Sequence, residues 1–191
     1  MTFEIALLLV QDALGTGAIY VLMALGIVLI FNVTRVIFVP YGDLVAYSAL
    51  TLASFQLQRT PGTVWLVITL AMLAFLTETG SLIRRRQSSL IPRAFLYWAV
   101  IPLIPALATL AIGVKDVSTP LAFMLTIALV LPLGPLLYRI VFQPIANAPV
   151  LVLLMVSVAL HFAISGLALL YFGPEGMRTS PFVRGDTGIG S

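Results

Sequence analysis

The chain has 191 residues, of which 61% are hydrophobic and only 9% are charged, and its mean hydropathy is +1.13. A soluble domain carries about 25% charged residues and could not bury this much apolar surface, so a soluble globular fold is excluded. The net charge of +3 does not indicate nucleic-acid binding, because the Lys and Arg residues lie at the ends of apolar segments, as membrane anchors do.

Uncharged stretches dominate the rest of the chain. A bilayer core needs about 20 apolar residues per helical crossing, and five stretches reach or approach that length. They cover residues 13–34, 60–77, 94–114, 117–138 and 140–174. With the shorter apolar segment 44–58, they predict an all-α, polytopic helical membrane protein of about six transmembrane helices.

The first predicted helix runs from about residue 5 to 33, with a polar outer turn at residues 11–17. No Lys or Arg precedes Arg35, unlike a secretory signal peptide, so we expect this helix to be retained. The second, residues 44–58, would be about 22 Å long and is not expected to cross alone. We therefore expect residues 36–42 to dip into the membrane before it.

The remaining predicted helices are bounded by charges, prolines and glycines. The third lies between Gly62 and Arg84, the fourth between Arg93 and Lys115, and the fifth between Pro120 and Arg139. The sixth begins at 147–149 and ends before 173. Prolines inside the fourth and fifth helices predict kinks at Pro102, Pro105, Pro132 and Pro135.

The distribution of positive charge predicts the sidedness. With the N-terminus outside, six arginines lie inside and four basic residues lie outside, as the positive-inside rule favours. Those inside are Arg35, Arg84, Arg85, Arg86, Arg93 and Arg139; those outside are Arg59, Lys115, Arg178 and Arg184.

The sequence contains no recognisable phosphate-binding, metal-binding or catalytic motif. The single lysine, Lys115, is not in a glycine-rich phosphate loop. One histidine, no cysteine and seven scattered acids form no metal-ligand or acid/base pattern. We therefore predict no catalytic residue, no metal and no cofactor, and no enzymatic activity.

Three polar residues share one face of the sixth helix. Ser157, His161 and Ser165 are spaced four apart, in the middle of an apolar segment. Polar groups at that depth face a partner helix or a cavity. Two interpretations follow: His161 is a neutral histidine bonded to a neighbouring helix, or it lines a solute path.

Charged residues near the predicted helix ends also have two interpretations each. Asp43 follows Gly42 at the start of the second helix, where a carboxylate favours the helix dipole and could cap the helix. Alternatively, the helix is broken at membrane depth and exposes backbone groups to a solute. Arg35 is either an interfacial anchor or a solute ligand. Glu78 is expected to pair locally with the arginines at 84–86.

Two blocks of sequence resemble the permease subunits of branched-chain amino acid ABC importers. The first contains residues 14–20, Ala-Leu-Gly at 24–26, Phe-Asn-Val-Thr-Arg-Val-Ile-Phe at 31–38 and Gly-Asp-Leu at 42–44. The second contains Tyr-Arg at 138–139 and Phe-Gln-Pro-Ile at 142–145. Together with the segments between their motifs, the blocks cover about half the chain.

The sequence also departs from that family's pattern. Members usually have a polar Asn-Phe-Ala-His-Gly stretch before the acid, whereas residues 37–42 here include Pro40 and Tyr41. Three apolar segments, instead of one, separate the second helix from the Tyr-Arg motif. The two added crossings leave the predicted sidedness unchanged.

The resemblance implies a subunit of the bacterial inner membrane that forms part of a solute path. Its implied partners are a second, homologous permease subunit, cytoplasmic ABC ATPases, an external solute-binding protein and membrane lipid, without nucleic acid. Family members continue for several more helices, so we expect residues 1–174 to be the N-terminal part of the permease domain and 175–191 a truncated external loop. The candidate path residues are Arg35, Tyr41, Gly42, Asp43, Ser157, His161 and Ser165.

Two alternative functions are open at this point. One is a permease of the same kind for another small polar solute, such as urea, amides or aromatic acids. The other is a membrane scaffold or assembly protein that needs no ATPase.

Overall fold

The computed structural model describes residues 3–84, 91–115, 117–174 and 177, and within these ranges the chain forms helices and no strand. Four helices have 16 residues or more, whereas two of the predicted crossings are each assembled from several shorter pieces. In chain order the elements are α1 (Phe3–Thr34), α2 (Tyr41–Gln56), α3 (Gly62–Arg84), α4 (Ile91–Phe95), η2 (Leu96–Val100), α5 (Ile101–Ile112), α6 (Thr119–Val130), α7 (Leu133–Leu137), η3 (Tyr138–Phe142), η4 (Gln143–Ile145) and α8 (Val150–Phe172).

Five helical stretches are long and apolar enough to cross a membrane. They are Ile5–Thr34, Gly62–Arg84, Ile91–Ile112, Thr119–Ile145 and Val150–Phe172. The predicted second helix corresponds to α2, whose 16 residues span about 24 Å, less than a bilayer core. The chain is therefore a multi-pass helical membrane protein, and its described residues contain five helical stretches long enough to cross and the shorter α2.

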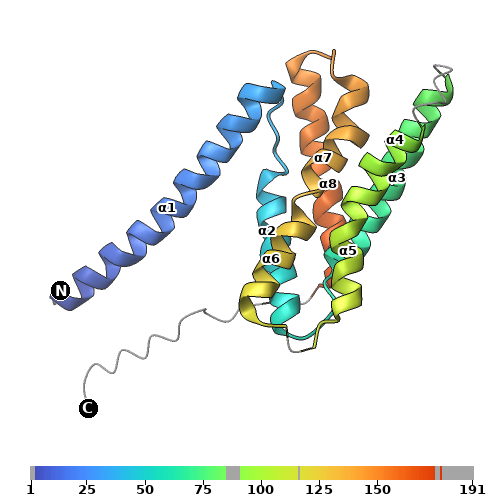
Figure 1. Ribbon diagram of the computed structural model, residues 1–191. Helices are drawn as coiled ribbons and strands as arrows, with labels where there is room; N and C mark the ends of the chain where they lie inside the picture. The colour runs from blue at the N-terminus through green and yellow to red at the C-terminus, as the bar shows by residue number, and fades with distance from the viewer. Residues whose placement is uncertain (1–2, 85–90, 116, 175–176, 178–191) are drawn as a thin grey trace.

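All helices except α1 form one bundle (Figure 1). Helix α3 packs against α5 and α8, while α2 packs against α6 and α8. The core contains Val64 and Val67 of α3, Leu129 and Leu133 of the α6–α7 crossing, and Phe142, all nearly inaccessible. These apolar contacts give dense packing among helices, whereas outward-facing apolar side chains suit lipid.

Helix α1 stands apart from the bundle and meets it near its C-terminal end (Figure 1). It is continuous through the polar turn at residues 11–17, and none of its apolar window is buried. Its exposed apolar side chains, such as Leu22 and Leu29, would be in contact with lipid or a partner.

Of the four prolines at which kinks are predicted, Pro132 lies at a break between helices, whereas Pro102, Pro105 and Pro135 lie within α5 and α7. Residues 131–132 interrupt the α-helical hydrogen-bond pattern, and α7 begins directly after Pro132. A π-helical turn, η2, ends two residues before Pro102, and Pro105 lies inside α5. Proline lacks an N–H donor and crowds the preceding turn, which is why these crossings are built from several pieces.

Basic residues gather at one end of the bundle. Arg35, Arg84, Arg93 and Arg139 belong to segments at the end where α1 and α3 stop and α4 and α8 begin, whereas Arg59 and Lys115 lie at the opposite end (Figure 1). Arg85, Arg86, Arg178 and Arg184, and the predicted loop 175–191 apart from Met177, lie outside the described residues. The asymmetry agrees with the predicted sidedness, which stays a prediction.

Candidate functional site

The connection from α1 to α2 is a non-helical segment, residues 35–40, that runs beside the bundle (Figure 1). Arg35 ends α1 with φ +56°, in the left-handed region that helices do not continue through. The Thr34 hydroxyl donates to Ile30 O at 2.8 Å and accepts from Val36 N at 3.2 Å. Pro40, with φ −65°, is the N-cap of α2.

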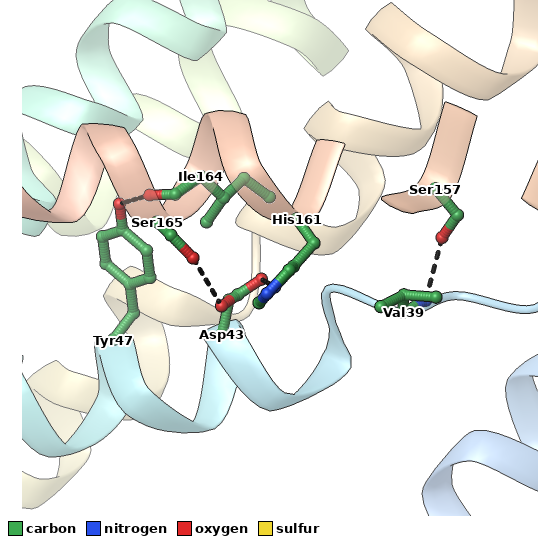
Figure 2. Close-up of polar contacts among 7 residues, drawn as sticks. All are labelled: Val39, Asp43, Tyr47, Ser157, His161, Ile164 and Ser165. Carbon is green, nitrogen blue, oxygen red and sulfur yellow. Dashed lines mark hydrogen bonds and ion pairs between the residues drawn. The ribbon is translucent and has the colours of Figure 1, made fainter. Parts of the chain in front are cut away.

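The polar face of α8 contacts this segment and the first turn of α2. Val39 N donates to Ser157 Oγ at 2.8 Å. Asp43 Oδ2 lies 2.7 Å from His161 Nδ1, and Ser165 Oγ donates to Asp43 Oδ1 at 3.3 Å (Figure 2). Two groups of candidates, predicted from segments more than 100 residues apart, therefore form one cluster.

Asp43 does not cap its own helix through its side chain. The N-cap residue Pro40 makes no side-chain hydrogen bond, and the Asp43 carboxylate instead bonds with α8. Asp43 does lie in the first turn, where its charge favours the helix dipole, so this part of the capping interpretation agrees with the structure. The other interpretation, a helix broken at membrane depth that exposes backbone groups to a solute, stays a prediction.

A buried tyrosine extends the cluster along α2. Tyr47 OH donates to Ile164 O at 2.9 Å, and Tyr47 is almost inaccessible (Figure 2). The sequence analysis missed this residue, although its position one helical turn after Asp43 could have indicated it. It fixes α2 against α8 next to the Asp43–His161 pair.

The cluster lies near the middle of the 23-residue α8, and it is only partly covered. The side chain of Asp43 is 13% exposed and that of His161 is 39% exposed. Charged and polar groups at membrane depth are costly against lipid, so they face a partner helix or a water-filled cavity. The uncovered part of His161 therefore marks a surface that hydrocarbon would not occupy.

Three predicted path residues lie outside the cluster. Arg35 is exposed, and its side chain makes no ion pair with the described part of the chain. The Tyr41 ring packs against Gly26 of α1, where a Cβ would clash with the phenol. Gly42 is exposed and faces open space. Ser157 is buried, and its hydroxyl holds the segment through Val39.

A second charged pair joins α3 to η3. Glu78 forms an ion pair with Arg139, and their side chains are 18% and 11% exposed. Arg139 is therefore the ion-pair partner of Glu78 among the described residues, and Arg84 makes no ion pair with it; Arg85 and Arg86, the other partners expected for Glu78, lie outside the described residues. Packing of α3 against η3 brings Arg139 next to Glu78, a contact that sequence distance hides. The Arg139 guanidinium also lies over the Trp98 ring, 5.6 Å from its centroid.

The Asp43 cluster can bind polar or cationic groups without covalent chemistry. If His161 is neutral with Nδ1 protonated, the ring donates to Asp43 and the pair keeps the negative charge of the carboxylate. Among the described residues, no three His, Asp or Glu side chains are placed to hold a metal ion.

Fold and cluster together define a multi-pass helical membrane protein with a polar site where a short helix starts against α8. No protein-family model, curated protein or solved structure matches the chain. A particular family is therefore a matter of proposal, and it rests on the motif residues and the geometry of the cluster.

Proposed function

We propose that the chain is a permease subunit of an ABC importer of the bacterial inner membrane, and that it forms part of the path for branched-chain or similar amino acids. The observation that carries the proposal is the partly exposed Asp43–His161 pair in the middle of α8. A carboxylate at this depth calls for a polar occupant or partner. The class of importer is proposed from the two blocks of sequence that resemble permeases of branched-chain amino acid importers.

The start of α2 suits the two charges of an amino acid. The first turn of a helix leaves backbone N–H groups without intrahelical acceptors, and the dipole there attracts anions. Gly42, exposed and without a side chain, lets a solute carboxylate approach these groups. The Asp43 carboxylate next to it would bind the solute ammonium. Discontinuous helices serve transporters in this way.

The proposed partners follow from the same class. A second permease subunit would complete the path on the side where His161 is uncovered, cytoplasmic ATPases would drive the conformational change, and an external binding protein would deliver the solute. The described residues supply only helices and a polar cluster, so ATP hydrolysis is assigned to a separate subunit.

Uptake of labelled leucine tests the proposal in cells that produce the chain together with its neighbouring genes, where the proposal expects an ATPase, a binding protein and a second permease subunit. Asp43→Asn should lower uptake about tenfold to hundredfold, because hydrogen bonds to a charged group contribute about 1.5–3 kcal/mol. Asp12→Asn is the matched control, since Asp12 is an exposed carboxylate on α1. His161→Ala should act like Asp43→Asn.

The outcomes separate the alternatives. Uptake of urea, an amide or an aromatic acid in place of leucine would assign the other solute class to the same path. Equal leucine uptake by Asp43→Asn and the parent, at equal membrane levels, would remove Asp43 from the path. Neighbouring genes without an ATPase or binding protein, together with no uptake of any solute, would favour a membrane scaffold.

A further inference from the structure

A cavity distinct from the Asp43 cluster opens between α3, α4, η2 and α7. Its volume is about 470 Å³, within the range of about 300–1,000 Å³ that is typical of small-ligand sites. Its lining combines two charged residues, two aromatic residues and four apolar ones: Glu78, Arg93, Tyr97, Trp98, Leu82, Ala94, Ile101 and Pro135.

The charges around the cavity leave an excess of one positive charge. Glu78 is neutralised by its ion pair with Arg139. Arg93 is exposed and has no carboxylate partner within the described ranges; its guanidinium lies 5.7 Å from the centroid of the Tyr97 ring. Arg139 Nε is buried and makes no hydrogen bond with the described residues. The cavity therefore favours an anion next to Arg93.

The position of the cavity indicates where that anion comes from. It lies at the end of the bundle where α3 stops at Arg84 and α4 starts at Ile91. Tyr97 is 52% exposed, and Trp98 is half-buried beside it. Tyr and Trp gather where membrane meets water. Below them, the outward-facing Ile101 continues an apolar surface toward the membrane interior.

We propose that this cavity binds the phosphate headgroup of an anionic phospholipid. The Arg93 guanidinium binds the phosphate, Tyr97 and Trp98 contact the glycerol region, and an acyl chain lies along Leu82 and Ile101. Basic pockets between membrane helices bind anionic headgroups by this combination of charge and apolar surface. The mainly apolar lining favours a lipid over a free anion. The proposal is independent of the transport function.

Quenching of Trp98 by brominated lipid tests it. The chain has two tryptophans, so Trp65→Phe leaves Trp98 as the single fluorophore. The purified full chain is placed in phosphatidylcholine vesicles containing a small fraction of phosphatidylglycerol with brominated acyl chains, or the same fraction of brominated phosphatidylcholine. Brominated phosphatidylglycerol should quench Trp98 at a mole fraction several-fold lower than brominated phosphatidylcholine needs for the same quenching.

In the Trp65→Phe protein, Arg93→Gln should weaken the preference for phosphatidylglycerol over phosphatidylcholine about fivefold, the effect of one arginine near an anionic lipid. Arg93→Lys should keep most of it. Arg84→Gln is the matched control, because it removes an exposed charge at the same end outside the cavity. Circular dichroism of each variant verifies that the helices are intact.

Three results would overturn the proposal. The first is equal quenching by both lipids in the Trp65→Phe parent, which needs no variant at Arg93. The second is an equal loss of the preference for phosphatidylglycerol in Arg84→Gln and Arg93→Gln, which would show that the preference comes from general surface charge. The third is reversal of quenching by excess glycerol phosphate, which would make the cavity a site for free anions.

Discussion

At the scale of single residues, two of the contacts that α8 makes with its neighbours depend on side-chain size. Tyr47 reaches Ile164 O with its hydroxyl, and Gly62 lets the start of α3 approach the end of α8. A Cβ at Gly62 would lie 2.5 Å from Tyr171 O and 2.9 Å from its carbonyl carbon. Because these atoms are backbone, they cannot rotate away, so the glycine sets how closely α3 and α8 approach.

Gly62→Ala should therefore destabilise the protein by about 1–3 kcal/mol, the usual effect of overpacking a close contact. Gly80→Ala, at an exposed position of the same helix with nothing within 4 Å, should be neutral or stabilise by up to about 1 kcal/mol. Unfolding of both variants in detergent micelles checks the difference. Equal stability of the two would show that α3 and α8 can separate without cost.

At the scale of elements, we expect α2 and the segment before it to form one broken crossing. The 16 residues of α2 are too few to span a bilayer alone, and residues 35–40, which precede it, contact α8 through Val39. Backbone groups outside a helix need partners at membrane depth. Ser157 supplies one by accepting from Val39 N, so a single hydroxyl of α8 holds the segment that leads to Asp43.

Ser157→Ala should loosen that segment. Loss of the acceptor should speed hydrogen exchange of the Val39 amide roughly two- to tenfold, because a typical hydrogen bond contributes about 0.5–1.5 kcal/mol. Ser48→Ala is the matched control, since the Ser48 hydroxyl donates to Leu44 O within its own helix. Exchange measured by mass spectrometry in detergent or nanodiscs reports both. Unchanged exchange at Val39 in Ser157→Ala would show that packing alone holds the segment.

At the scale of the whole molecule, the sidedness decides which end of the bundle would meet the ATPases of the proposed importer. The basic residues of the α3–α4 end predict that this end is inside and that the N-terminus is outside. The same arrangement would place the lipid cavity in the inner leaflet, where Arg93 meets anionic headgroups.

Labelling of introduced cysteines tests the sidedness, because the chain has none of its own. Thr60 and Asn147 are both exposed and lie in connections at opposite ends of the bundle. A membrane-impermeant maleimide should label Thr60→Cys in intact spheroplasts and Asn147→Cys only after permeabilisation. The reverse pattern would place the N-terminus inside.

The class of the protein followed from the sequence because long apolar segments without charges are unfavourable in water, whatever the order of their apolar residues. The bounds of α3 and α8 and the break at Pro132 also followed, since end residues and prolines act through local backbone geometry. The Ser157, His161 and Ser165 face could be predicted because helical periodicity is local. What that face would meet could not.

Only the tertiary structure decided the partners of the charged residues. Glu78 pairs with Arg139 of a distant helix, and Asp43, in the first turn of α2, also bonds with α8. It also separated Arg35, Tyr41 and Gly42 from the cluster, and it left α1 outside the bundle. The physical reason is the same in each case. Helix packing sets which side chains far apart in the chain lie within hydrogen-bonding distance, and apolar segments of similar composition hold almost no information about which helix packs against which.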